Sequence, residues 1–195
     1  MKTGLKLIGG EKIESPKSDK TRPTTLMVRE ALFNILSKNV VNSNWLDLFS
    51  GTGAVSCEAY NHGAKLIIAV EKDRLIAELC KKNLLSLNDS HINKNNIQVI
   101  CKDVFSWLKS SVRENDSKHS KSQYPQFDYI YIDPPYASDL YEVLLEELFN
   151  SCLITESTIV ICEHIKSKQI KNNNLWKVKD IRTYGQTTLT FLIKI

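Results

Sequence analysis

The sequence predicts an α/β fold built on a mostly parallel β-sheet that ends in an antiparallel hairpin. From residue 45 onward, short apolar runs alternate with segments of helical period, which is the pattern of repeated β–α units. The apolar runs are nearly continuous, as expected of parallel strands that helices cover on both faces. The last two runs, 175–185 and 187–195, follow each other without a helix between them and therefore predict the hairpin.

The expected elements begin with a small amino-terminal hairpin. Two short alternating runs flank Gly9-Gly10, a turn pair that tolerates positive φ. A polar loop with two prolines then leads into TTLMVREALFNILSK (24–38). This segment has apolar residues at helical spacing, and Thr24 or Thr25 can cap its start, so it predicts a helix.

The remaining elements form the α/β domain, which we assign to residues 25–195, with residues 1–24 as a basic extension. The expected strands are 45–49, 66–71, 97–101, 127–133 and 157–163, and the expected helices are 53–63, 73–87, 103–112 and 139–150. Residues 112–126 are polar and without period, and we expect a flexible surface loop there.

The composition narrows the class of protein. The chain has 195 residues and is 42% hydrophobic, enough for the core of one domain, and its apolar runs are too short to cross a bilayer. We therefore expect a cytoplasmic protein with no membrane partner. The five cysteines lack a CxxC spacing and are expected to be reduced thiols of the core. The four histidines are scattered without ligand spacing, so no metal is expected.

Positive charge is concentrated in the amino-terminal segment. The net charge is +4, and residues 1–45 hold eight basic and four acidic residues, which equals the whole excess. A basic arm on a near-neutral body fits a polyanionic partner. A solvated, lysine-rich surface explains the same count equally well.

A glycine-rich turn follows the first strand of the domain. In WLDLFSGTGA (45–54), Gly51 and Gly53 let the backbone pass close to a ligand, and the next helix offers free N–H groups to a negative group. Glu71 ends the second strand, twenty positions after Gly51, where a carboxylate reaches ribose hydroxyls. Asp103 follows the third strand and can accept a hydrogen bond from an adenine amino group.

Two nucleoside cofactors are compatible with a glycine turn of this kind. A dinucleotide site requires Gly-x-Gly-x-x-Gly, and Ser56 stands at the third glycine position, so that pattern is incomplete. S-adenosylmethionine is a single nucleoside with an amino-acid tail, whose carboxylate would lie at the turn. We therefore favour S-adenosylmethionine. The structural alternative is a tight turn with two surface acids at helix starts.

The segment FDYIYIDPPYAS (127–138) ends the fourth strand unusually. Its two prolines cannot continue a ladder and hold a rigid bend, which leaves the Pro134 carbonyl pointing outward beside Asp133. These two acceptors can bind both N–H groups of a planar exocyclic amine, and Tyr136 offers a face on which a base stacks. A negative Asp133 favours the positive charge that reaches the amine when a sulfonium donates its methyl group.

These motifs together resemble a known family. DPPY after the fourth strand and LDLFSGTGA before it look like the amino-methylating branch of class I S-adenosylmethionine-dependent methyltransferases. LIGG, TRPTTLMVREALFNIL and LDLFSGTGA resemble the RsmD family of bacterial 16S rRNA guanine-N2 methyltransferases, over nearly the whole chain. The resemblance implies a Rossmann-like class I methyltransferase domain with a seven-stranded sheet. It also implies methylation of one guanine N2 of 16S rRNA, within a 30S subunit or an assembly intermediate.

The resemblance assigns roles to three groups of residues. The residues expected to bind the cofactor are Asp47, Phe49, Ser50, Gly51, Thr52, Gly53, Glu71, Lys72, Asp103 and Val104. Those expected to hold the base for catalysis are Asp133, Pro134, Pro135 and Tyr136. Those expected near the target loop or the rRNA phosphates are Arg22, Thr24, Thr25 and Arg29. Ser56 and Cys57 depart from the family's pattern, in which we expect smaller or aliphatic residues.

Three other functions stay open at this point. A DNA amino-methyltransferase can carry the same DPPY, although such enzymes usually need a larger region for target recognition. Methylation of a glutamine amide in a protein is also an amine-acceptor reaction, but the basic arm and Tyr136 favour nucleic acid. A non-catalytic RNA-binding assembly factor would not need the carboxylate of Asp133.

Overall fold

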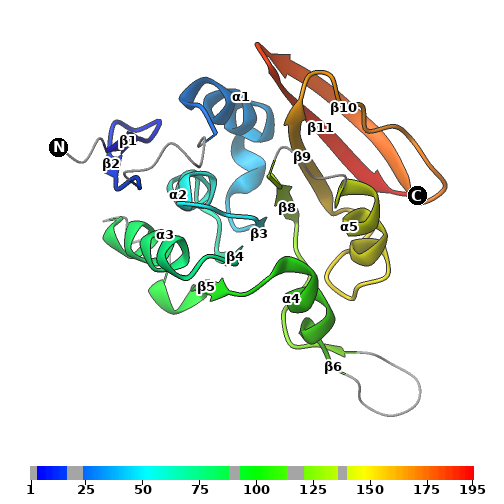
Figure 1. The fold of residues 1–195 in the computed structure, drawn as a ribbon, viewed down its shortest axis with the longest axis horizontal. Coiled ribbons are helices and arrows are strands. Elements are labelled where there is room, and N and C mark those ends of the chain that lie inside the picture. The colour runs from blue at the N-terminus through cyan, green and yellow to red at the C-terminus, as the bar shows by residue number, and fades with distance from the viewer. Residues whose placement is uncertain (1–3, 17–23, 88–92, 114–120, 136–139) are drawn as a thin grey trace.

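A computed structural model describes residues 4–16, 24–87, 93–113, 121–135 and 140–195 (Figure 1). Its main sheet has seven strands in the order β10-β11-β9-β8-β3-β4-β5. Their bounds are β3 Asn44–Leu48, β4 Leu66–Glu71, β5 Ile97–Cys101, β8 Tyr129–Ile132, β9 Ile159–Ile165, β10 Trp176–Tyr184 and β11 Thr187–Lys194. Five neighbouring strands of this sheet, β5, β4, β3, β8 and β9, are parallel. β11 pairs antiparallel with both β9 and β10. The predicted sheet and its carboxyl-terminal hairpin are therefore confirmed.

The chain order reverses at β3, which places the ligand edge of the sheet. β3 pairs with β4 on one side and with β8 on the other. The connections leaving β3 and β8 therefore diverge to opposite sides, and a crevice opens between them at the carboxyl ends. The glycine turn follows β3 and the proline pair follows β8, so the two motifs of the sequence meet at this crevice.

Five α-helices of the described chain cover the two faces of the sheet (Figure 1). α1 Leu26–Leu36, α2 Ala54–Asn61 and α3 Arg74–Ser86 contribute to one apolar core, and α4 Val104–Ser111 and α5 Leu140–Phe149 to the other. Two short 3-10 helices, η1 Ser37–Val40 and η2 Lys94–Asn96, precede β3 and β5. Alternate residues of β3 serve the two cores: Trp45 packs with α1 and α2, and Leu46 and Leu48 pack on the opposite face.

The amino-terminal hairpin is present and packs on the domain. β1 Leu5–Lys6 pairs antiparallel with β2 Lys12–Ile13 around the predicted glycine turn. Leu7 and Ile13 are buried within the core that α1 and α2 share. The hairpin is thus held by the same apolar core as the sheet, while the domain boundary after residue 24 stays a prediction.

Two expectations about the chain are corrected. β6 Val112–Arg113 pairs with β7 Lys121–Ser122, so two parts of the expected loop are strands; residues 114–120 lie outside the described part. Polar side chains do not prevent pairing, because the backbone supplies the hydrogen bonds. Cys101 is exposed rather than in the core, because it ends β5, the edge strand of the sheet.

No helix of the described residues is long and apolar enough to cross a membrane.

Candidate active site

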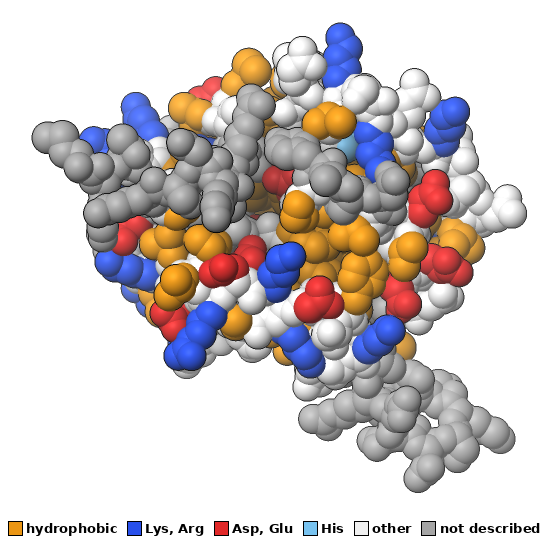
Figure 2. Space-filling view, viewed as in Figure 1, with side chains coloured by type: hydrophobic (Ala, Val, Ile, Leu, Met, Phe, Trp, Pro, Cys, Tyr) orange, Lys and Arg blue, Asp and Glu red, His pale blue; other side chains and the backbone are white. Residues whose placement is uncertain are grey.

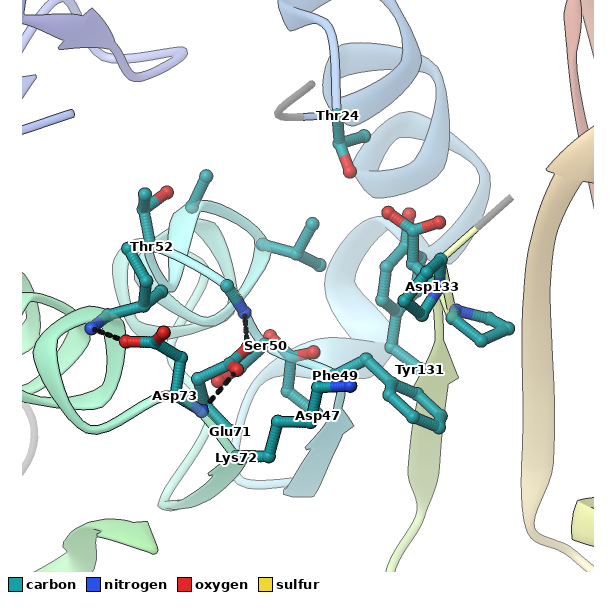
Figure 3. Close-up of a pocket in the computed structure, with 16 residues that line it drawn as sticks. Thr24, Asp47, Phe49, Ser50, Thr52, Glu71, Lys72, Asp73, Tyr131 and Asp133 are labelled. Carbon is teal, nitrogen blue, oxygen red and sulfur yellow. Dashed lines mark hydrogen bonds between the residues drawn. The ribbon is translucent and has the colours of Figure 1, made fainter. Parts of the chain in front are cut away.

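Two adjoining cavities lie at the ligand edge of the sheet, and Figure 3 shows the residues that line the first of them. The first has a volume of about 410 Å³ and the second about 280 Å³, and both are lined by Phe49, Lys72 and Pro135. The other predicted residues that line the first are Thr24, Asp47, Ser50, Gly51, Thr52, Glu71, Asp133 and Pro134, and those that line the second are Asp103 and Val104. Tyr136 and Arg22 lie outside the described residues.

The turn after β3 carries three residues with left-handed backbone conformation: Phe49 at φ 66°, Gly51 at φ 51° and Gly53 at φ 77°. A Cβ added at Gly51 would meet no atom within 4 Å, so its backbone faces open space. A Cβ at Gly53 would lie 2.6 Å from the Cys80 Sγ, so glycine is what lets α3 approach the turn. Phe49 is a bulky residue in a region that such residues rarely adopt, and its ring lines both cavities.

Glu71 joins the glycine turn to the start of α3. Its Oε2 accepts a hydrogen bond from the Gly51 N–H at 3.0 Å, and its Oε1 accepts one from the Asp73 N–H at 2.9 Å. Asp73 in turn caps α3 by accepting from the N–H groups of Leu75 and Ile76. Each oxygen of a carboxylate can accept a second hydrogen bond, so Glu71 retains capacity for a ligand hydroxyl. Its contact with ribose stays a prediction.

Asp47 lies at the first cavity and is only 2% exposed. The pKa of its carboxyl is raised to about 7, chiefly by burial and also by the charge of Glu71, while the hydrogen bond that Ser56 donates lowers it. The Ser56 Oγ lies 2.5 Å from the Asp47 Oδ2. Ser56, which departs from the family's pattern, therefore supplies a donor that this buried carboxylate requires. Cys57, the second departure, is fully buried in the core beside α1.

Asp133 and Pro134 bring the proline motif to the wall of the same cavity. Burial raises the pKa of the Asp133 carboxyl well above its usual range, and the charges of Glu163 and Asp47 raise it further. Among the described residues that line the first cavity, Lys72 is the one basic residue, against four acidic ones. In the described part of the chain, no group of three or more His, Cys, Asp or Glu side chains is arranged to hold a metal ion.

Two residues that the sequence analysis did not assign to the site, Tyr131 and Glu163, lie in and behind this part of the cavity wall. Tyr131 lines the first cavity, and its hydroxyl donates a hydrogen bond to the Glu163 Oε2. The Thr24 hydroxyl donates to the same oxygen at 2.9 Å. Glu163 belongs to β9 and is 2% exposed, so it lies directly behind the wall. The sequence contains a signal for Glu163: it ends the expected strand 157–163, just as Glu71 ends the expected strand 66–71.

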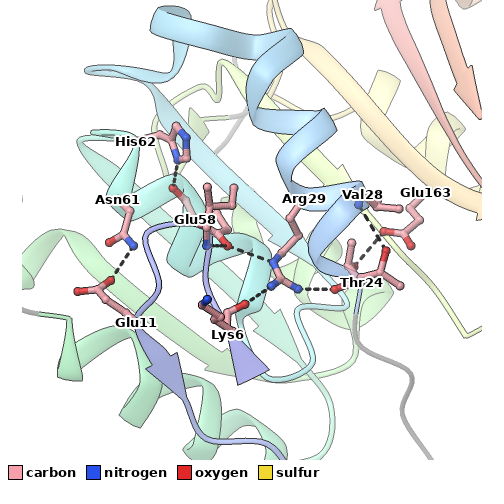
Figure 4. Close-up of polar contacts among 11 residues, drawn as sticks. Lys6, Glu11, Thr24, Val28, Arg29, Glu58, Asn61, His62 and Glu163 are labelled. Atoms are coloured by element: carbon pink, nitrogen blue, oxygen red, sulfur yellow. Dashed lines mark hydrogen bonds and ion pairs between the residues drawn. The ribbon is translucent and has the colours of Figure 1, made fainter. Parts of the chain in front are cut away.

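The structure contradicts the prediction that Arg29 lies near the target loop or the rRNA phosphates (Figure 4). It is fully buried, its Nε lies 3.1 Å from the Glu58 Oε1, and its Nη2 donates to the Lys6 carbonyl at 2.5 Å. A buried guanidinium paired with a carboxylate cannot reach phosphates, so its charge is structural. Thr25 accepts a hydrogen bond from the Val28 N–H and caps α1, and its contact with RNA stays a prediction.

The strand order and the glycine turn define the Rossmann-like class I methyltransferase fold. Solved structures agree. The yhhF protein of Escherichia coli superposes with a TM-score of 0.79 at 23% identity, over 98% of both chains. The protein SMU.776, whose crystal structure contains SAH, superposes with a TM-score of 0.69 at 17% identity, over 95% of this chain and 54% of that one.

Sequence comparison assigns the chain within this class. The family model described as Conserved hypothetical protein 95 matches residues 5–193. The protein named Ribosomal RNA small subunit methyltransferase D from Buchnera aphidicola is 32% identical over 173 residues, which cover 87% of this chain and 82% of that protein. The chain therefore belongs to the RsmD family, as the motif resemblance predicts.

Proposed function

We propose that this protein transfers a methyl group from S-adenosylmethionine to N2 of a guanine in 16S rRNA, within a small ribosomal subunit or an assembly intermediate. One observation carries the proposal. Asp133 and Pro134, the expected amine acceptors, line the same cavity as the glycine turn and Glu71, the expected cofactor residues. The name of the Buchnera relative, an rRNA small subunit methyltransferase, supports the choice of substrate.

The residues present suit S-adenosylmethionine. Asp47 and Asp133 supply negative charge for a sulfonium, and the open backbone at Gly51 leaves room for the amino-acid tail. Phe49 and Val104 offer apolar surface for adenine in the second cavity, with Asp103 as an acceptor for its amino group. SMU.776, which shares the fold, contains SAH, the demethylated form of this cofactor. When bound, the cofactor supplies an electrophilic methyl group.

Asp133 and Pro134 would then bind the acceptor amine. The lone pair of an exocyclic amine is delocalised into the base, so the amine is a poor nucleophile that needs orientation. The Asp133 carboxylate and the Pro134 carbonyl can accept its two N–H groups, and Asp133 can receive the proton that the amine releases. A raised pKa makes Asp133 a stronger proton acceptor, and a neighbouring cation favours its ionised form. Tyr136 is proposed to stack on the base.

Basic residues of the carboxyl-terminal segment and at the ligand edge of the sheet support a polyanionic substrate. Residues 166–195 hold seven basic residues and one acidic residue, a net charge of +6. Residues 46–165 carry a net charge of −6, which cancels this segment, so the +4 of residues 1–45 equals the whole excess, as the sequence count predicts. Lys72, Lys102 and Lys166 are exposed just beyond the carboxyl ends of β4, β5 and β9. We call these three the basic rim. Figure 2 shows hydrophobic side chains near the centre of one face, with charged side chains around them.

Parallel methyl-transfer assays test the choice of substrate. Small ribosomal subunits, naked 16S rRNA, duplex DNA and a protein extract are each incubated with the enzyme and tritiated S-adenosylmethionine. We expect incorporation into the subunits or the naked rRNA only. Incorporation only into DNA would favour the DNA amino-methyltransferase, and incorporation only into protein the glutamine methyltransferase. Absence of transfer to any of them, with cofactor binding intact, would favour the non-catalytic assembly factor.

A further inference from the structure

Glu163 is a buried carboxylate that the proposed reaction does not yet use. Its Oε2 accepts hydrogen bonds from the hydroxyls of Tyr131 and Thr24, which come from β8 and from the segment before α1. Both of these residues line the first cavity, whereas Glu163 lies behind them. One oxygen therefore holds together two parts of the cavity wall that are more than a hundred residues apart in the sequence.

The position of Thr24 is fixed from a second side (Figure 4). Its carbonyl accepts a hydrogen bond from Arg29, whose Nε pairs with Glu58 at 3.1 Å. The Glu58 Oε1 also accepts from the Ile8 N–H of the amino-terminal hairpin at 3.0 Å. The Thr24 hydroxyl is thus presented to Glu163 by a buried polar chain that starts at the hairpin. Such a chain leaves little freedom for this part of the wall.

Asp133 lies within reach of the negative charge of Glu163. Among the described residues, the titratable groups that interact with Asp133 are Glu163 from β9, Asp47 from β3, and Tyr131 from β8, the strand that ends just before it. Figure 3 shows Thr24 and Asp133 directed toward the same space. Across the cavity lie Glu71 from β4, Lys72 and Asp73, which are the other charged residues among its described lining. After burial itself, Glu163 is the largest cause of the raised pKa of Asp133.

We propose that Glu163 is a positioning residue for methyl transfer: it anchors the Tyr131 and Thr24 hydroxyls in the cavity wall and places a negative charge behind Asp133. This inference rests on the proposed function for its kinetic consequence. The anchored wall keeps Asp133 facing the acceptor amine. The charge keeps the Asp133 carboxylate a strong proton acceptor in a site that also binds a cation.

Glu163→Gln tests the charge with the side-chain shape retained. Removing a negative charge lowers the pKa of Asp133, so we expect its titration to move by about one pH unit toward acid. Carboxyl-carbon NMR of the protein labelled at aspartate measures this in the absence of any substrate, and Asp133→Asn identifies the signal. An unmoved Asp133 titration in the folded Glu163→Gln variant would overturn the electrostatic part of the proposal.

Kinetics test the positioning role. In Glu163→Gln we expect kcat to fall by about 100-fold, the acid limb of the pH–rate profile to move to lower pH, and S-adenosylmethionine binding to stay within about two-fold. Thr24→Val should lower kcat, and Thr24→Ser, which keeps the hydroxyl, should restore it. Wild-type kcat in both Glu163→Gln and Thr24→Val would overturn the proposal. If the wild-type protein methylates no substrate, the proposed function fails, whereas the NMR titration still tests the charge of Glu163.

Discussion

At the residue scale, the site gathers carboxylates near the carboxyl ends of neighbouring strands, and two of them, Asp47 and Glu163, are buried. Asp47 is buried and accepts a hydrogen bond from the Ser56 hydroxyl. Its pKa is raised to about 7, chiefly by burial. A carboxyl with a raised pKa is more easily accommodated when protonated or beside a cation. The stability of the empty protein should therefore depend on pH through this residue.

We predict that Asp47→Asn weakens the pH dependence of stability. The folded protein keeps the Asp47 proton up to about pH 7, whereas the unfolded chain releases it near 3.8. The native state binds more protons across this window, so the free energy of unfolding of the wild type falls as the pH rises through it. Relative to the wild type, Asp47→Asn should gain stability across the window, on the order of 4 kcal/mol. Urea unfolding of both proteins without cofactor measures this, and parallel pH profiles would contradict it.

At the element scale, α1 and the amino-terminal hairpin are joined to the domain by one buried ion pair. Arg29 and Glu58 have no exposed side-chain surface, and both bind backbone groups of the hairpin. Removing one partner of such a pair leaves an uncompensated buried charge. The exposed pair of Arg74 and Glu78 on α3 has the same Nε–Oε1 distance, 3.1 Å, and provides a matched control.

We predict that Arg29→Ala lowers the free energy of unfolding by about 3 to 5 kcal/mol. Arg74→Ala should cost less than about 0.5 kcal/mol, because solvent screens an exposed pair. Chemical denaturation of the two variants beside the wild type gives both values. Equal and small losses would mean that the buried pair does not hold α1 and the hairpin in place.

The helices and strands were largely predictable because their apolar period is local information. The glycine turn, Glu71 and the proline motif were predictable for the same reason, since each follows a strand directly. The burial of Arg29 was not predictable, because its partner Glu58 is 29 positions away and the two residues pair only when α1 packs on α2. The link from Thr24 to Glu163 spans 139 positions and likewise depends on the tertiary structure.

At the scale of the whole molecule, the acidic first cavity is bordered by the basic rim. The rim residues Lys102 and Lys166 are exposed at the ligand edge, whereas Lys38 and Lys65 are exposed near the amino ends of β3 and β4, at the opposite edge. This arrangement suits a substrate whose phosphates lie outside the cavity while one base enters it. Counting charged residues along the sequence could not reveal the basic rim, because the rim depends on which strand ends lie side by side in the fold.

We predict that Lys102→Gln/Lys166→Gln makes RNA binding less dependent on salt. Each phosphate contact contributes about 0.7 to the slope of log K against log salt for single strands, so the slope should fall by about 1.4. The control Lys38→Gln/Lys65→Gln removes the same charge at the opposite edge and should leave the slope unchanged. Binding to a 16S rRNA fragment across a salt series measures both. Equal slopes for the two double variants would remove the basic rim from the binding surface.

The central claim is that Asp133 directs one base amine to the methyl group of the bound cofactor. The most direct measurement is mass spectrometry of nucleosides from 16S rRNA treated with wild-type protein or with Asp133→Ala, alongside calorimetric binding of S-adenosylmethionine to each. The account predicts N2-methylguanosine with the wild type, a loss of at least about 100-fold with Asp133→Ala, and similar cofactor affinity for both. Full methylation by Asp133→Ala, or a methyl group on another atom of the RNA, would contradict it.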